Sequence, residues 1–317
     1  LLDLPSPVAL GTVADVVPLV GDNRTITAFG LRQVKRTRFA GLNALIDAAA
    51  LRAEKVDAYH VGFVLGPRLN ACGRMGHAAK AVHLLTRADE KEAAEIAAFL
   101  TGENDRRRET ERAIFAEAHG LVVENGWDSS DRRAIVVAKE GWHAGVIGIV
   151  ASRLVEAFAR PVVILDLSGG SEGSAHGSAR SIDGFSIHEA LCACGSLLSR
   201  FGGHSMAAGV ALPAAAVDAC RESLCAHAAA HLTADDLLLR GVTLDRPPQR
   251  MGRTGAHLSL TLRQGDRLMR AVAFGMGDRC DQLAAGSTID AVFEPKVSAW
   301  QGVRRPEIHL KDLRPAV

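Results

Sequence analysis

The chain has 317 residues, enough for two or three domains, because domains usually run to about 100–200 residues. Hydrophobic residues make up 48% and charged residues 23%, and no stretch approaches the roughly 20 uninterrupted apolar residues of a membrane span, which excludes disordered, collagen-like and membrane classes. With 37 Lys and Arg against 36 Asp and Glu the net charge is +1. Any binding of a polyanion must therefore come from a local basic patch.

The six cysteines lie in long apolar segments of a chain that is too large to need disulfide bonds for stability. They are expected to be reduced thiols in a cytoplasmic protein. Cys192 and Cys194 lack the CxxC spacing of zinc sites and fall on a helical pattern, which favours buried small side chains over a metal cluster. The chain begins at Leu1 without a signal or transit segment, and we expect it to be a piece of a longer protein.

The first third of the chain mixes one strand-like run with helical patterns. Residues 8–20 are apolar and β-branched, which predicts a buried strand followed by a turn or a short helix. Residues 26–50 have a helical rhythm. Residues 62–75 are so rich in Gly, Pro and Asn that no regular element is expected there.

A long helix is predicted to follow and to cross between two domains. Thr86 and Asp89 supply start signals, and apolar positions recur at helical spacing on both sides of a charged stretch. Gly102 is the expected place for this helix to bend or break.

After Gly126 the pattern becomes that of an α/β unit of about 100 residues. Its predicted strands are 134–139, 161–167, 174–182 and 208–212, and its predicted helices are 146–158, 186–198 and 215–231. From Leu237 onward the helical pattern stops, and short alternating runs predict a small antiparallel barrel or sandwich. These runs are 257–262, 268–274, 288–295 and 307–313.

Asp15 stands in an otherwise apolar segment, where burying an unpaired carboxylate would be costly. It is therefore expected to be hydrogen-bonded, paired or bound to a metal. No other Asp, Glu or His falls nearby in the pattern, and one carboxylate does not make a catalytic metal site.

Three glycine-containing segments combine polar groups that suit an anion. Residues 68–74 hold two arginines and an amide, which could clamp a phosphate or form an interdomain salt bridge. Residues 141–148 place His143 and free backbone amides at the start of a helix, where an anion could bind. Trp142 and His143 could equally be residues that pack in the core and cap the helix. Residues 177–181 offer a hydroxyl and an arginine to a phosphate or to an acidic side chain.

Residues 201–209, FGGHSMAAG, are the sharpest local signal in the chain. The two glycines let the backbone approach a ligand closely, and His204 places a polar imidazole side chain beside them. The alternative is a tight turn before a strand, with His204 exposed.

Taken in order, these segments resemble the RecJ family of single-strand-specific exonucleases, in the DHH phosphoesterase superfamily. The matching segments are 9–19, 23–31, 67–75, 141–154, 177–191 and 202–209, and residues 293–315 resemble the end of that family's OB-like domain. The resemblance covers nearly the whole chain.

The resemblance implies an α/β fold in four parts. These are the C-terminal remnant of a DHH α/β domain (1–85), a long connecting helix (86–128), a DHHA1 α/β substrate-binding domain (129–233) and a C-terminal OB-like β-barrel that binds nucleic acid (234–317).

The resemblance also implies a 5′-to-3′ exonuclease that releases mononucleotides from single-stranded DNA with two Mn²⁺ or Mg²⁺ ions, in recombination and repair. Asp15 matches the family's fourth metal motif and would be both catalytic and metal-ligating. The family's other metal motifs precede that one and are absent from this sequence. The two-metal site is therefore expected to be incomplete, and the chain inactive alone.

The residues that would bind substrate are present. By resemblance, Ser178 and Arg180, together with Gly202, Gly203 and His204 of a GGH motif, would hold phosphates near the 5′ end.

Asn70 and Arg74 would line the cleft beside the metals, and His143 is assigned to the same phosphate-binding surface. In the barrel, basic residues and base stacking would bind the incoming strand. Trp300 is the best stacking candidate there, and a core tryptophan is the equal alternative.

The expected partners are single-stranded DNA, preferably with a 5′ phosphate, a helicase and a single-strand binding protein. The protein is expected to be a cytoplasmic monomer that binds no membrane. The alternative is a non-catalytic single-stranded-DNA-binding or scaffold relative of the same fold. A phosphodiesterase acting on very short RNA is disfavoured, because such proteins generally lack the terminal barrel that residues 237–317 predict.

Overall fold

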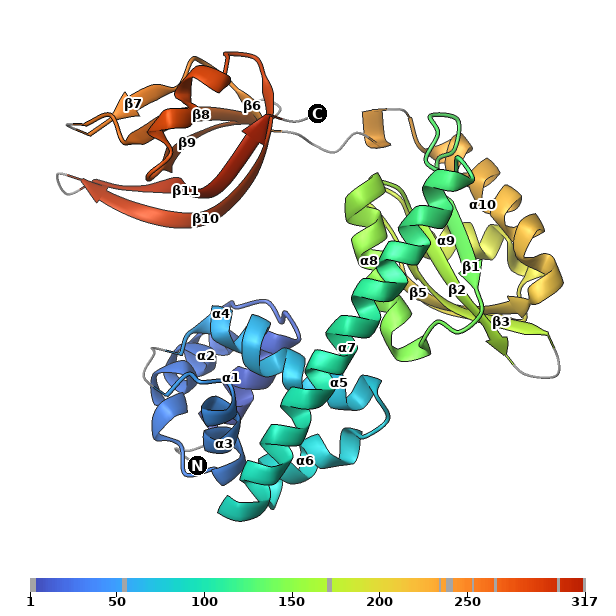
Figure 1. Cartoon of the computed structure of the whole chain (residues 1–317), viewed down its shortest axis with the longest axis horizontal. Coiled ribbons are helices and arrows are strands. Elements are labelled where there is room, and N and C mark those ends of the chain that lie inside the picture. Colours follow the sequence, from blue (N-terminus) through green and yellow to red (C-terminus); the bar gives the residue numbers. More distant parts are fainter. Residues whose placement is uncertain are drawn as a thin grey trace. The chain divides into compact units, whose positions relative to one another are not determined.

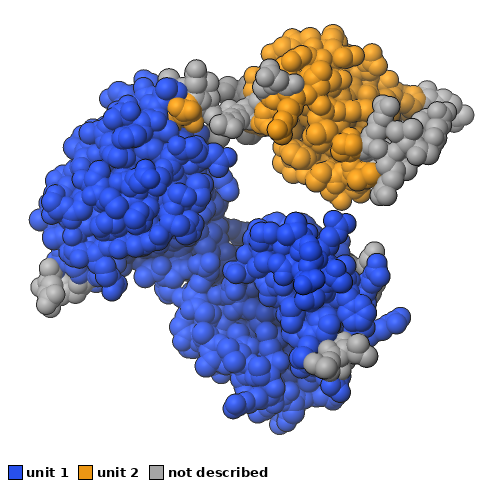
Figure 2. Space-filling model, turned by 180° about the vertical axis from the view of Figure 1, so that it is seen from behind, with its two compact units in different colours: residues 1–233 blue, residues 234–317 orange. Residues whose placement is uncertain are grey.

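The computed structural model describes residues 4–52, 56–169, 173–233, 235–237, 242–252, 254–264, 267–300 and 303–315 (Figure 1). The chain forms two compact units, residues 1–233 and 234–317 (Figure 2). Among the described residues, no helix combines the length and the apolar character that crossing a bilayer would require.

The first unit begins with short helices. These are α1 (Pro5–Ala14), α2 (Gly21–Gln33), α3 (Ala40–Ala48), α4 (Ala58–His60), α5 (Gly66–Arg74) and α6 (Ala78–Thr86), with a 3₁₀ turn at Val34–Arg36 and a π-helical turn at Val61–Leu65. Their buried leucine, isoleucine and valine side chains share one core with the first part of α7 (Glu90–Glu124).

The predicted strand within 8–20 is wrong, because residues 8–14 belong to α1, and a turn and irregular backbone follow at 15–20. Pro5 stands in the first turn, where its missing N–H costs nothing and its fixed φ suits a helix. The helix packs closely on α2, since a Cβ on Gly30 would lie 2.0 Å from the carbonyl oxygen of Pro5 and 2.7 Å from Ala9. Tertiary packing of small residues therefore outweighs the β propensity of the valines.

The absence of regular structure expected for 62–75 is also wrong. Gly66 and Pro67 occupy the first turn of α5, which directly follows the π-helical turn Val61–Leu65, and the N–H of Gly66 donates to the carbonyl oxygen of Val61. Gly66 is needed for packing, because a Cβ there would lie 3.0 Å from that of Ala14 in α1.

The long helix is α7, and it runs without interruption past Gly102, so the expectation of a break is wrong. The start signal at Asp89 is confirmed. Its carboxylate accepts the N–H of Glu92 at 2.9 Å, and the Glu92 carboxylate accepts the N–H of Asp89 at 3.2 Å.

The remainder of the first unit is a five-stranded sheet with helices on both faces. The strands are β1 (Ile135–Lys139), β2 (Val162–Gly169), β3 (Ser174–Arg180), β4 (Arg200–His204) and β5 (Ala207–Pro213), in the order β1-β2-β3-β5-β4. Only β1 and β2 run parallel. Helices α7 and α8 (Ala144–Phe158) pack on one face, and α9 (Ile187–Ala193) and α10 (Val217–His231) on the other (Figure 1). The α/β prediction is confirmed, although β4 was not predicted.

The second unit is a closed barrel, which decides between barrel and sandwich. Its strands are β6 (Val242–Leu244), β7 (Gln249–Met251), β8 (His257–Gln264), β9 (Arg267–Ala273), β10 (Thr288–Trp300) and β11 (Val303–Pro315). The order β6-β10-β11-β9-β8 closes through pairing of β6 with β8, and β7 adds to β8. Leu258, Leu260 and Leu262 alternate into its core with less buried neighbours between them.

Candidate nucleic-acid interface

One face of the five-stranded sheet carries polar residues from neighbouring strands. β3, β5 and β4 pair antiparallel, so paired residues and their second neighbours along each strand share this face. Three cross-strand rows result, running from β3 through β5 to β4: His176–Ala211–Arg200, Ser178–Gly209–Gly202 and Arg180–Ala207–His204. The central strand contributes only Ala and Gly, which leaves a hollow between the polar side chains of its neighbours.

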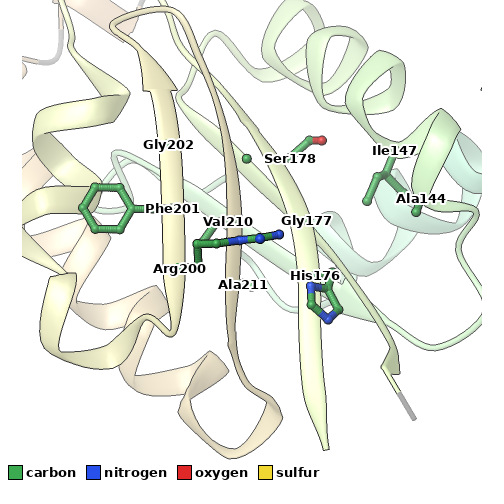
Figure 3. Close-up of a pocket in the computed structure, with 11 residues that line it drawn as sticks. Ala144, Ile147, His176, Gly177, Ser178, Arg200, Phe201, Gly202, Val210 and Ala211 are labelled. Carbon is green, nitrogen blue, oxygen red and sulfur yellow. The ribbon is translucent and has the colours of Figure 1, made fainter.

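This hollow is a cavity of about 420 Å³. Gly202 and Gly209 form part of its floor, and a Cβ added to either would meet no atom within 4 Å. Ala144 and Ile147 of α8 line it, and Arg200 extends across β5 toward β3 (Figure 3). A ligand in the cavity can lie directly against the backbone of the sheet.

Two arginines approach each other at the edge of this face. Arg74, at the end of α5, donates from Nη1 to the carbonyl oxygen of Gly145 at 3.1 Å. Arg180 packs with Ser178 against Gly148 of α8, where an added Cβ would lie 3.1 Å from Arg180 Nη2 and 3.3 Å from Ser178 Oγ. The glycines at the start of α8 therefore let two cationic residues and a hydroxyl gather there.

The electrostatics of this cluster favour an anion. Arg180 is half-buried, and burial lowers its pKa, with the nearby charge of Arg74 lowering that pKa further. Within the described part of the chain, the hydrogen bonds of both guanidinium groups go to backbone carbonyls, and neither forms an ion pair. A bound phosphate would supply the negative charge that this pair lacks.

Trp142 and His143 lie at the start of α8, the helix whose glycines contact Arg74, Ser178 and Arg180. Trp142 is buried, and its Nε1–H donates to Glu117 Oε2 at 2.9 Å, which together with Lys139 holds the pKa of Glu117 below its ordinary value. His143 is the N-cap of α8, because its Nδ1 accepts the N–H of Gly145 at 3.1 Å. The packing and capping roles are thus present, and a phosphate contact from exposed His143 stays a prediction.

The GGH motif forms the end of β4 and leads into a hairpin. Gly203 has a φ of +155°, and a Cβ there would lie 2.3 Å from the carbonyl oxygen of Ala207, so this glycine is required by strand pairing. Gly202 is open to the cavity. His204 is exposed, and its Nδ1 accepts the N–H of Met206 at 3.3 Å in the turn.

Asp15 does not lie where a buried carboxylate was expected. It is exposed at the C-terminal end of α1, where no burial has to be offset, so the expectation of a costly buried group is wrong. Asp15 and Asn70 line one cavity of about 240 Å³, apart from the sheet. Among the described residues, no group of three or more His, Cys, Asp or Glu side chains could hold a metal ion. These residues do not fit a two-metal centre by themselves.

The remaining predicted site residue is Trp300. Its backbone ends β10, but its side chain lies outside the described residues. The sequence reasoning also missed His176 and Arg200, which flank the cavity. The i, i+2 spacing of His176, Ser178 and Arg180 on a predicted strand would have placed three polar groups on one face, and recognising β4 would have added Arg200.

Two domain families match the chain. The DHHA1 domain matches residues 131–229, and the RecJ OB domain matches residues 237–312. The first match covers the five-stranded sheet and its cavity, and the second covers the barrel.

Curated relatives carry one description. The single-stranded-DNA-specific exonuclease RecJ of Bacillus subtilis (strain 168) is 35% identical over an alignment of 349 residues. This alignment covers 98% of this chain and 44% of the relative. The exonuclease of the same description from Escherichia coli (strain K12) is 41% identical over 219 residues, covering 67% of this chain and 37% of the relative. The chain thus spans less than half the length of these curated relatives.

Solved structures agree with these matches. The crystal structure of RecJ in complex with Mn²⁺ from Thermus thermophilus aligns with a TM-score of 0.70 and 30% identity, over 100% of this chain and 50% of that one. The corresponding Mg²⁺ complex aligns with a TM-score of 0.69 over 53% of that chain.

Proposed function

The chain belongs to the RecJ family, and on this premise we propose that it supplies the phosphate- and strand-binding surfaces of a 5′-to-3′ exonuclease acting on single-stranded DNA. The observation that carries the proposal is the Arg74 and Arg180 pair beside Ser178, which itself lines a cavity floored by glycine. We further propose that the enzyme works in recombination and repair.

A terminal 5′ phosphate fits this cluster in charge and in shape. Two guanidinium groups and a hydroxyl can donate to its oxygens, and a doubly charged end would neutralise the mutual repulsion of the arginines. The amide end of α8 adds its partial positive charge, and Gly202 lets the backbone approach. A phosphate within a strand carries less charge and a second ester link, so the cluster prefers an end. His143, Gly203 and His204 are proposed as lesser contacts.

We propose Mn²⁺ or Mg²⁺ as the cofactor, because the related crystal structures hold those ions. Bound metals of this kind activate water and stabilise the leaving oxygen. Asp15 is the proposed ligand, with Asn70 beside it. Because the described residues do not form a metal site by themselves, the role proposed for this chain's own residues is to bind and orient the DNA.

The second candidate is a non-catalytic single-stranded-DNA-binding or scaffold relative. The observation that favours it is the same lack, among the described residues, of a cluster able to hold a metal. Degradation of 5′-phosphorylated single strands by the whole gene product with Mn²⁺ would decide for the enzyme, and binding without degradation would decide for the scaffold.

The wider setting is proposed on the family's properties. We assign a cytoplasmic monomer with the four-part division at residues 85, 128 and 233. A helicase that opens duplex DNA and a single-strand binding protein are the proposed partners.

The test is the change of Arg180 to Ala. Charge-assisted hydrogen bonds of this kind contribute about 1.5–3 kcal/mol, so the preference for a 5′-phosphorylated over a 5′-hydroxyl oligonucleotide should fall roughly ten- to a hundredfold. Competition binding to the full chain measures both affinities. Arg112→Ala, at an exposed arginine of α7, is the matched control and should leave the preference intact. An unchanged preference in Arg180→Ala would remove this residue from the phosphate site.

A further inference from the structure

The barrel has the strand order of an OB fold. In chain order its five closing strands are β6, β8, β9, β10 and β11, with a 3₁₀ turn at Gly277–Gln282 between the third and the fourth. The third and fifth strands, β9 and β11, pair in parallel, as this topology requires. OB folds bind oligonucleotides on the face of strands two and three, which here are β8 and β9.

An exposed aromatic ring stands at the end of this face. Phe274 directly follows β9, and 53% of its surface is exposed to solvent. Its ring centroid lies 5.3 Å from that of His257, the first residue of β8, and 5.2 Å from that of His309 in β11, with interplanar angles of 68° and 64°. Phe274 therefore stands between two further rings from neighbouring strands.

The two histidines are held in place by hydrogen bonds. His257 Nδ1 accepts the backbone N–H of Gly275 at 2.9 Å, which fixes that ring beside Phe274. His309 Nε2 lies 3.0 Å from Glu307 Oε1. Because both neighbours are fixed, a base that stacks on Phe274 would meet a cluster that is already ordered, and little side-chain entropy would be lost on binding.

The net charge of the barrel indicates which ligand would bind beside Phe274. Residues 234–317 contain 13 Lys and Arg against 10 Asp and Glu, a net charge of +3, whereas residues 1–233 contain 24 against 26, a net charge of −2. Arg270 of β9 and Lys311 of β11 are 63% and 58% exposed, and each has an acidic neighbour: Arg270 Nε lies 3.7 Å from Glu307 Oε2, and Lys311 Nζ lies 3.0 Å from Glu294 Oε2. An exposed aromatic ring on a barrel of net positive charge suits a single nucleic-acid strand, whose bases stack while its phosphates contact cations.

We propose that Phe274, flanked by His257 and His309, is a base-stacking platform for single-stranded DNA. This inference rests on the proposed function and adds a second contact with the DNA. The arginine pair is proposed to bind the 5′ phosphate, and Phe274 is proposed to stack on a base. It replaces no metal or phosphate contact. It assigns a stacking role to a phenylalanine that lies on the ligand face, independently of Trp300.

The experiment uses the full chain and a 5′-hydroxyl oligothymidylate of about 16 nucleotides, the upper site size of an OB fold. Phe274→Ala should weaken its binding about five- to a hundredfold, as the loss of one stacked base does. An abasic oligomer of equal length carries the same charge without bases, and its binding should be the same for wild type and variant. Phe274→Trp should retain the affinity, and its added fluorescence should be quenched by the oligothymidylate.

Phe293→Ala is the matched control. Phe293 is 48% exposed on β10, and within the described part of the barrel its ring contacts no other ring. Its replacement should leave binding unchanged. If wild type binds oligothymidylate and Phe274→Ala binds it equally well, the stacking platform is wrong and the proposed function stands. If wild type binds neither oligomer, the proposed strand-binding function fails, and the platform fails with it.

Discussion

The sheet of the first unit and the barrel of the second differ in the chemistry that they offer to the nucleic acid proposed as their ligand. On the sheet, the three cross-strand rows contain no Phe, Tyr or Trp, although Phe201 of β4 also lines the cavity, and a ligand there faces glycine backbone, arginine, a hydroxyl and an imidazole. On the barrel, Phe274 stands between two imidazole rings. The first arrangement suits a charged end and the second suits flat bases.

The comparison also separates net charge from anion affinity. The unit that holds the Arg74 and Arg180 pair carries a net charge of −2, and the barrel carries +3. Affinity for a phosphate depends on the cations that face the site, and the remaining charges of the unit are largely screened beyond about 10 Å. The overall balance of a domain therefore says little about where it binds an anion.

Gly145→Ala should have the largest effect among the changes that test whether the sheet binds the 5′ phosphate and the barrel binds the bases. A Cβ at Gly145 would lie 2.2 Å from the carbonyl oxygen of Arg74, so α5 and α8 must shift apart. We expect a loss of about 3 kcal/mol in the unfolding free energy of the first unit, together with loss of the 5′-phosphate preference. Urea unfolding followed by circular dichroism measures the former.

Gly120→Ala is the control for this change, because a Cβ on that α7 glycine meets only the end of the Glu124 side chain, at 3.9 Å. It should be neutral or stabilising. Binding of oligothymidylate through the barrel should survive Gly145→Ala. Its loss would mean that the two regions do not act separately.

A smaller and more selective effect is expected from Gly209→Leu. The site above Gly209 is empty within 4 Å, so the leucine should fill the cavity without disturbing the strands. Affinity for a 5′-phosphorylated oligonucleotide should fall roughly tenfold, which corresponds to about 1.4 kcal/mol. Titration by fluorescence anisotropy measures it. Gly209→Leu should leave the affinity for 5′-hydroxyl oligothymidylate unchanged, whereas Phe274→Ala should lower that affinity and keep the preference for a 5′ phosphate. If Gly209→Leu lowers the affinities for the 5′-phosphorylated and the 5′-hydroxyl oligonucleotide equally, the sheet and the barrel do not have separate roles.

The smallest effect concerns Glu117→Gln. Because hydrogen bonds from Trp142 and Lys139 lower the pKa of Glu117, its carboxylate stabilises the fold above the ordinary glutamate pKa, and this contribution is lost as the pH falls through the lowered value. The Glu117 side chain is about half exposed, so the variant should lose less than about 1 kcal/mol at pH 7. Unfolding curves at pH 7 and near pH 3 should converge at the acid end. A difference that persists there would show that the charge is not the cause.

The pattern of elements in the second half of the chain was largely predictable from sequence. Runs such as 134–139 and 161–167 are short, β-branched and bounded by turn residues, and they became β1 and β2. Strand β4 was missed because RFGGH has no alternation of apolar and polar side chains. Its two glycines are explained by pairing with β5 and by the open cavity floor, which are non-local facts.

The first half was less predictable. The segment 8–20 favours a strand by local propensity, and residues 8–14 are helical because Pro5 suits the start of α1 and because α1 packs closely against Gly30 of α2. For the site, the chemistry of Arg180 and Ser178 could be recognised from sequence, but their approach to Arg74 depends on how α5 packs on α8. Packing of this kind has no local sequence signal.

The contact between Arg74 and the start of α8 has a consequence for synthesis of the chain. Arg74 and Gly145 lie 71 residues apart in sequence, and Ser178 and Arg180 follow later still. Closing so long a loop costs entropy that only the finished sheet can offset. A chain emerging from the ribosome therefore carries Arg74 and Arg180 apart until the strands of the sheet have been made, and the proposed 5′-phosphate site forms only when the first unit is complete.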